Sequence, residues 1–166
     1  MKTREFQDIG EFLLHLAELE VGIAIAEDRG LERVCQIIEK DAKAQIGHYQ
    51  DAVGPFQDWA PLADSTEAEK ARKGYPLDAP LLREGNLRDS IEHEVARGEA
   101  VVGSKSDVAE YQEFGTATIP PRPFIGPAAF KNKEAIERVL GATLVEGLTG
   151  GELIHEALGY DFEVKP

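Results

Sequence analysis

The longest regular pattern in the chain lies in its first fifty residues. The stretch from Phe6 to Gln50 reads FQDIGEFLLHLAELEVGIAIAEDRGLERVCQIIEKDAKAQIGHYQ. Apolar side chains recur at the spacing of one face of an α-helix. They form two successive stripes: Ile9, Phe12, Leu13, Leu16, Leu19 and Ile23, and then Leu31, Val34, Cys35, Ile38, Ala42, Ile46 and Tyr49. Asp28-Arg29-Gly30 separates the stripes, so the pattern allows two helices or one long helix bent near Gly30.

Both stripes must be covered by something, and the middle of the chain supplies a small sheet. Residues 91–95 alternate between apolar and polar side chains, which is the pattern of a half-buried strand. Arg97-Gly98-Glu99 then reads as a turn, and residues 100–103 as the returning strand. The sequence therefore predicts an antiparallel β-hairpin over about residues 91–103.

Two helix starts are indicated by capping patterns. Thr66 is followed three residues later by Glu69, the arrangement of a capping box, and predicts a short helix there. Asp107 with Glu110 predicts a second helix start, and Gly115 marks the end of that helix.

The C-terminal part reads as a long helix from about Pro127 to Glu146, with a further short helix over about residues 152–158 and a tail. Taken together, these elements predict an α+β fold. In it, N-terminal helices pack on a small antiparallel sheet, accompanied by a long C-terminal helix. We expect residues 1–166 to form a single domain, with a helical part at 1–50 and a C-terminal helix and tail at 147–166.

The composition limits the classes of partner. The 166 residues carry 31 acidic and 18 basic side chains, for a net charge of −13. Such a surface repels nucleic acid, which argues against a conventional DNA-binding protein, and it can meet a basic partner. No apolar run approaches the roughly 20 residues of a membrane-spanning helix, so we expect no membrane contact.

The motifs of catalysis and metal binding are missing from the sequence. His15, His48, His93 and His155 are far apart and do not form ligand pairs with each other or with the single cysteine. The serines lie outside any Gly-x-Ser-x-Gly elbow, and the glycines at 147–151 lack the Lys-Ser/Thr of a phosphate loop. We predict no catalytic residue, no cofactor and no metal, and hence a protein that is not an enzyme.

Four pieces of sequence, in a fixed order, point to a family. They are Trp59-Ala60-Pro61-Leu62 with Thr66, Leu81-Leu82-Arg83-Glu84-Gly85-Asn86-Leu87-Arg88-Asp89-Ser90-Ile91, Val102-Gly103, and Tyr111-Gln112-Glu113-Phe114-Gly115-Thr116 followed by Ile119-Pro120-Pro121-Arg122-Pro123-Phe124-Ile125. The set resembles the tail-completion, or head–tail neck, family of siphophages and the related phage virion-morphogenesis proteins. The match spans about residues 35–140, and its strongest part is Phe-Gly-Thr followed by Pro-x-Arg-Pro-Phe.

The resemblance implies a structural virion protein, with the family core at 51–146, that works as a ring-forming head–tail connector. Such a ring joins the portal side of the capsid to the tail tube, lets DNA pass without binding it specifically, and uses no cofactor. We expect a hexameric ring, with a dodecamer as the alternative, assembled in the host cytoplasm and found in the virion. The expected partners are further copies of the chain, portal, adaptor or stopper proteins, and tail terminator or tail tube proteins. The chain departs from the family at Glu84, where threonine is common, and in its longer N-terminal helical part.

The proline-rich segment is the candidate interface. Pro120, Pro121 and Pro123 stiffen the backbone, so Arg122 and Phe124 could be presented to a neighbouring subunit at low entropic cost. The alternative is a clamp within the chain, in which Arg122 pairs with a carboxylate of its own subunit and Phe124 fills its own core. The predicted core anchors are Trp59, Leu62, Leu87, Ile91, Tyr111 and Phe114.

Two other functions remain open. The strong negative charge would suit an acidic cytosolic binding module, such as an assembly chaperone or a DNA mimic, although that function gives the Pro-Arg-Pro-Phe segment no role. A hydrolase that uses scattered carboxylates is the third possibility, because such enzymes often have no linear motif.

Overall fold

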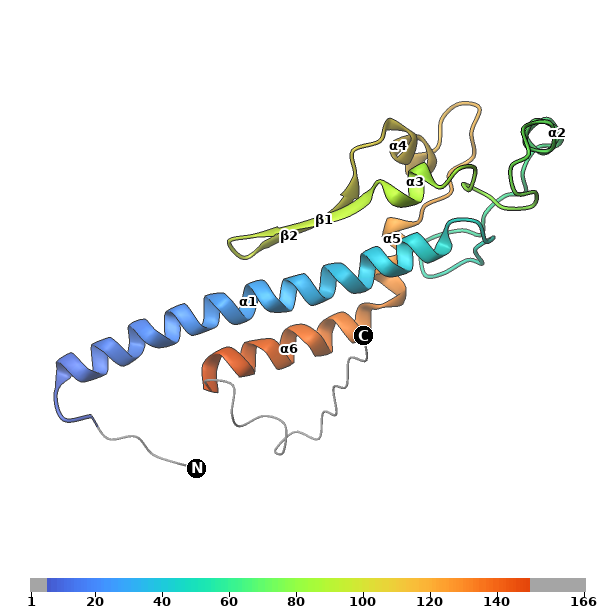
Figure 1. The fold of residues 1–166 in the computed structure, drawn as a ribbon. Coiled ribbons are helices and arrows are strands. Elements are labelled where there is room, and N and C mark those ends of the chain that lie inside the picture. Colours follow the sequence, from blue (N-terminus) through green and yellow to red (C-terminus); the bar gives the residue numbers. More distant parts are fainter. Residues whose placement is uncertain (1–5, 150–166) are drawn as a thin grey trace.

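A computed structural model describes residues 6–149, and this part of the chain is built along one long helix (Figure 1). Helix α1 spans Ile9–Gln45. A hairpin of strands β1 (Ile91–Ala96) and β2 (Glu99–Ser104) lies along one side of α1, and helix α6 (Lys133–Thr149) lies along the other. The predicted α+β class, with a small antiparallel sheet and a C-terminal helix, is confirmed.

Helix α1 is continuous through Gly30, so the sequence's alternative of two separate helices is wrong. The glycine instead lets another helix pack closely against α1. Gly30 is buried, and a Cβ atom added to it would lie 3.0 Å from the Thr143 side chain of α6. A Cβ atom added to Gly147 of α6 would likewise lie 3.0 Å from atoms of Ile23 and Ala26. The two helices approach each other closely because glycine has no side chain at these crossing points.

The hairpin matches its prediction. The strands are antiparallel, with Ile91 opposite Ser104 and Ala96 opposite Glu99. Its two-residue turn, Arg97-Gly98, has positive φ at both residues, 54° and 77°, which is the conformation of the tightest hairpin turns. The alternation seen in the sequence also holds, since Ile91 is buried and its neighbour Glu92 is exposed.

Four shorter helices complete the described part: α2 (Asp64–Lys73), α3 (Asn86–Asp89), α4 (Asp107–Phe114) and α5 (Ile125–Lys131). Both predicted short helices are present, and α4 ends before Gly115 as predicted. The predicted cap residues, Thr66 and Asp107, are wrong, because both lie inside the helices. The residue that precedes α2 is Ala63, the one that precedes α4 is Ser106, and neither makes a side-chain capping bond.

The predicted C-terminal helix is divided, because α5 and α6 are separate elements with Asn132 between them. The predicted short helix at 152–158 and the tail lie outside the described residues. Within residues 6–149, no helix has an apolar stretch sufficient to cross a membrane.

The core lies where the C-terminal end of α1 meets the hairpin and α5. Its buried apolar members are Ala42, Ile46, Trp59, Leu87, Ile91, Ala109, Phe124 and Ala128. Cys35 of α1 is buried, and its burial raises the pKa of the thiol. Phe124, at the end of the proline-rich segment, and Ala128, in the first turn of α5, therefore belong to the core.

Candidate interface site

The Pro-Arg-Pro-Phe segment is a clamp within the chain. Arg122 is only 6% exposed, and its guanidinium donates hydrogen bonds to the carbonyl oxygen of Ala60 at 3.0 and 3.3 Å and to that of Pro61 at 3.2 Å. Phe124 is fully buried in the core. The prediction that these two side chains contact a neighbouring subunit is therefore wrong, because both are already used to close the fold.

The intramolecular alternative is correct in outline but names the wrong partner. Arg122 binds backbone carbonyls of the 59–62 loop, not a carboxylate. The planar fork of guanidinium donors can reach two successive carbonyl oxygens of a loop that lacks regular hydrogen bonds. Of the prolines proposed for the interface, Pro121 is exposed and Pro123 is half-buried.

A carboxylate does hold this segment, but it comes from α4 and accepts hydrogen bonds from backbone N–H groups. Glu113 accepts hydrogen bonds from the backbone N–H of Phe124 at 2.8 Å, of Ile125 at 3.2 Å and of Gly126 at 3.0 Å. These are free N–H groups at the start of α5, which a negative charge stabilises. Sequence reasoning missed Glu113, since nothing local marks a cap supplied from eleven residues upstream.

The same unit includes the only tryptophan. Trp59 donates from Nε1 to the carbonyl oxygen of Pro123 at 3.0 Å, and Gln45 of α1 donates to that of Phe124 at 3.2 Å. The Trp-Ala-Pro, Gln-Glu-Phe-Gly and Pro-Arg-Pro-Phe pieces of the sequence thus meet in one packed unit. The motifs behind the family resemblance mainly build this scaffold.

The predicted core anchors divide into two groups. Trp59, Leu87 and Ile91 are buried as predicted, and Leu62 is half-buried. The prediction is wrong for Tyr111 and Phe114, because their side chains are 49% and 77% exposed.

The inner side of the short helix α4 is occupied by the buried Ala109, and its apolar stripe faces outward. Val108, Tyr111 and Phe114 are all exposed on the outer side. An apolar stripe left outside is a candidate contact surface.

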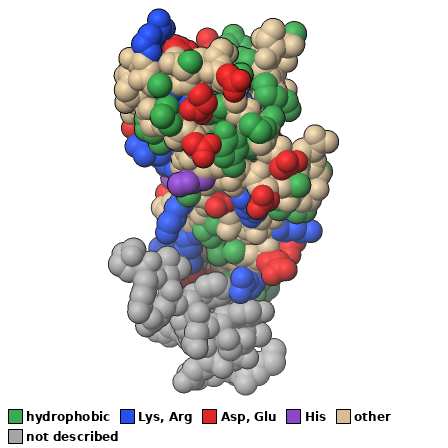
Figure 2. Space-filling view, turned by 90° about the vertical axis from the view of Figure 1, so that its right-hand side faces the viewer, with side chains coloured by type: hydrophobic (Ala, Val, Ile, Leu, Met, Phe, Trp, Pro, Cys, Tyr) green, Lys and Arg blue, Asp and Glu red, His purple; other side chains and the backbone are tan. Residues whose placement is uncertain are grey.

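Beside α4 lies an open cleft with a volume of about 750 Å³. Val108 and Tyr111 line one wall, and Leu62, Lys70 and Arg83 belong to the opposite side. Figure 2, which looks onto this end of the molecule, shows apolar side chains gathered among acidic ones in its upper part. The cleft therefore continues the exposed apolar face of α4.

Lys70 holds the α2 side of this cleft in place. Its side chain is buried, its ammonium donates to the carbonyl oxygen of Ala79 at 2.5 Å, and burial lowers the pKa of the amine. The lysine therefore fastens α2 to the loop that precedes α3, a role that the sequence did not indicate.

His93 contacts two carboxylates on another element. It projects from β1 between Glu32 and Glu39 of α1, with Nε2 3.0 Å from a Glu32 oxygen and Nδ1 hydrogen-bonded to Glu39. Only the protonated ring can donate from both nitrogens. The bonds to Glu39 and Glu32 raise the pKa of His93, so the charged form is favoured. This cluster fastens the hairpin to α1.

Among residues 6–149, no group of three histidine, cysteine or acidic side chains is arranged to hold a metal ion. Comparison of the chain with protein-family models, with curated proteins and with solved structures finds no match. A functional assignment therefore depends on the motif resemblance and on the surfaces described above.

Proposed function

We propose that the chain is a ring-forming subunit of the neck of a tailed bacteriophage, which joins the portal side of the capsid to the tail and lets DNA pass. The ordered motif set supports the family. The observation that carries the ring is the presence of two different exposed apolar surfaces on the subunit. A closed ring of more than two copies joins its subunits head to tail, so each copy needs two unlike surfaces.

The first surface is the outer side of α4 with the adjoining cleft. The second is on α6, where Leu140, Leu144 and Leu148 follow one another at four-residue steps and are all exposed. Figure 1 places α4 and α6 on opposite sides of α1. Contact between the α4 face of one copy and the α6 face of the next would leave neither surface uncovered, and six copies, or twelve, would close the ring.

The negative charge suits a ring through which DNA slides. With a net charge of −13, a subunit repels phosphates, so DNA can pass the lumen without being retained. An acidic chaperone or DNA mimic would share this charge. Such a protein would be absent from mature particles, whereas a neck subunit stays in them.

The first experiment asks whether the protein is part of the virion. Particles of the phage that encodes it are purified and analysed by mass spectrometry and by electron microscopy of the neck. We expect several copies per particle, arranged with six-fold or twelve-fold symmetry. Absence from purified particles would exclude a neck subunit and favour the chaperone.

The second experiment breaks one ring surface. A Tyr111→Ser, Phe114→Ser double variant replaces two exposed side chains, so the free protein stays folded. Supplied to a phage that lacks the gene, it should yield full heads and complete tails that fail to join. Val101→Ser is the matched control, because Val101 is an equally exposed apolar residue on the hairpin. Infectious particles from the double variant would rule out the α4 face as a ring contact.

A further inference from the structure

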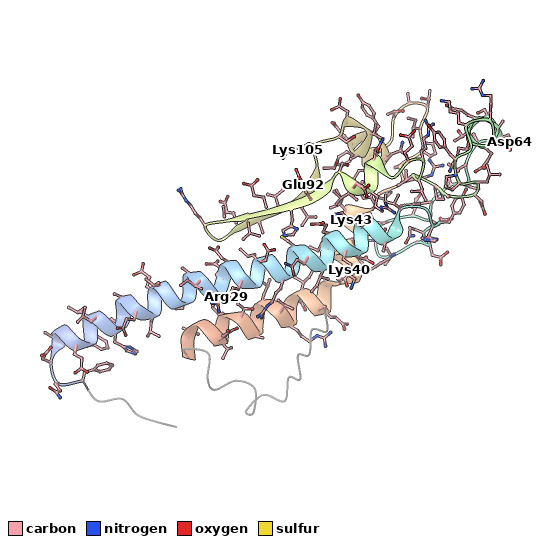
Figure 3. The ribbon with its side chains drawn as sticks, viewed as in Figure 1. Arg29, Lys40, Lys43, Asp64, Glu92 and Lys105 are labelled. Atoms are coloured by element: carbon pink, nitrogen blue, oxygen red, sulfur yellow. The ribbon has the colours of Figure 1, made fainter. Side chains whose placement is uncertain are left out.

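A third exposed surface runs along α1 itself. With about 100° of rotation per residue, fourteen residues of α1 fall within about a third of its circumference. Nine of them form one strip; the other five, His15, Gly22, Glu32, Glu39 and Lys43, are half-buried. We call this strip the outer face of α1; its residues are Glu11, Leu14, Glu18, Val21, Ile25, Arg29, Arg33, Gln36 and Lys40. All except the half-buried Glu11 are exposed. Figure 3 labels Arg29 and Lys40 on α1, in the strip between the hairpin and α6.

Charge is divided along this face. Helix α1 contains no lysine or arginine before Arg29, and its outer face carries only acidic charge in that half, at Glu11 and Glu18. In the second half the outer face carries Arg29, Arg33 and Lys40. The carboxylates of that half, Glu32 and Glu39, are directed to His93 of the hairpin. Since the helix dipole acts only within the first and last turns, it does not explain charges at the centre of α1.

The spacing of these charges matches in the two halves. Glu11 and Glu18 are seven residues apart, and so are Arg33 and Lys40, which corresponds to two helical turns in each case. In an antiparallel pair of α1 helices, Glu11 can face Lys40 of the other copy in the same register in which Glu18 faces Arg33. Both pairs share one midpoint, between Ile25 and Ala26.

The neighbouring elements leave room for such a partner. An open groove of about 510 Å³ lies between α1 and the hairpin, lined by Asp28, Arg29, Glu32, Arg33, Gln36 and Val95. The turn of the hairpin contacts α1 here, where the backbone N–H of Gly98 donates to Asp28 at 2.9 Å. The first half of α1 extends past the turn, so it can lie in the groove of another copy (Figure 1).

We propose that two copies of this chain pair antiparallel through the outer face of α1, with the acidic half of each helix on the basic half of the other. The two-fold axis passes near Ile25, whose exposed side chain contacts its own equivalent. Leu14 and Val21 pack on the aliphatic stems of the facing arginine and lysine side chains. Two-fold symmetry repeats both ion pairs, which makes the contact self-complementary. The proposal concerns the free protein and does not rest on the proposed function.

The test uses the full-length protein and charge reversal. Analytical ultracentrifugation at 50 mM salt should give a dimer that weakens as salt rises. Glu11→Lys with Glu18→Lys, and separately Arg33→Glu with Lys40→Glu, should each weaken the dimer by about a hundredfold or more, because like charges then face each other. An equimolar mixture of the two variants should form a heterodimer, since every facing pair is again of opposite sign.

A fourth variant tests the register. Glu11→Lys with Lys40→Glu keeps every pair of the antiparallel arrangement attractive, so its dimer should persist. In a parallel, staggered pair, where Glu11 would face Arg33, the same change sets like charges against each other and the dimer should be lost. Glu94→Lys with Glu134→Lys is the control for the Glu11→Lys, Glu18→Lys variant, because it makes the same charge change at exposed positions away from this face.

A monomeric wild-type protein at 100 µM and low salt would overturn the proposal, as would a variant mixture that stays monomeric. Loss of the dimer in the Glu94, Glu134 control would show that net charge alone governs association, and would also overturn it. Circular dichroism melting of each variant confirms that the exposed substitutions leave the fold intact.

Discussion

The two halves of α1 are made of similar residues but have opposite surroundings. In the second half, Val34, Cys35 and Ala42 are buried under the hairpin, α5 and α6. In the first half, apolar side chains are exposed, including Ile9, Leu13, Leu14, Leu16 and Val21. One helix therefore serves two purposes. Its second half organises the fold of the subunit, and its first half projects an apolar and acidic surface that suits association.

The largest effect should come from the core at the end of the second half. Replacing Phe124 by Ala leaves a cavity against Trp59 and Ile91, and should lower the free energy of unfolding by about 3–5 kcal/mol. Leu13→Ala in the first half, at an exposed residue outside the outer face, should change it by less than about 0.5 kcal/mol. Urea denaturation of both variants measures the contrast. Equal losses would mean that the projecting half also belongs to the folding unit.

Two glycines of α1 sharpen the same contrast. Gly30→Ala places a Cβ 3.0 Å from Thr143, so strain should exceed the gain in helix propensity and lower stability by about 1–2 kcal/mol. At Gly22 the new Cβ would meet only the Gly147 carbonyl oxygen, at 3.6 Å, and Gly22→Ala should raise stability by about 0.5–1 kcal/mol. Opposite shifts in melting temperature are the expected result. A stabilising Gly30→Ala would mean that the two helices can separate at no cost.

The tie between the hairpin and α1 should depend on pH. Because the folded-state pKa of His93 is raised, its contribution to stability is complete below the unfolded value, about 6.5, and is lost as pH rises through the folded pKa. The pKa of Glu39 is lowered, chiefly by Lys43 and then by His93, so its contribution is lost as pH falls below the unfolded carboxyl value. His93→Gln should therefore flatten the loss of stability above neutral pH. An unchanged pH profile would mean that His93 does not contribute to the attachment of the hairpin to α1.

The smallest effect should be that of the outer face of α4. Phe114→Ala should change stability by less than about 0.5 kcal/mol, although Leu87→Ala, at a buried anchor of the same predicted core, should cost about 2–5 kcal/mol. Differential scanning calorimetry of the two variants gives the comparison. A large loss at Phe114 would contradict its exposure and return it to the core.

The sequence predicted the elements better than it predicted their contacts. The hairpin was correct because alternation of apolar and polar residues and an Arg-Gly turn are local signals. The pairing of Gly30 with Thr143 could not be read, since it joins residues far apart in the chain. The roles of Arg122, Phe124 and Glu113 depended on which surface the proline-rich segment meets. The error at Tyr111 and Phe114 has a related cause, because a two-turn helix gives too few residues to tell a covered stripe from an exposed one.

Cys35 provides a built-in reporter for the packing around α1. It is the only cysteine of the chain, and its thiol is buried and held protonated by the raised pKa. A thiol reagent can therefore modify the protein at one place only, and only in the moments when the helix is uncovered. The rate of thiol modification therefore reports how often the helix is uncovered. It should slow whenever a partner holds the hairpin and α6 against the helix.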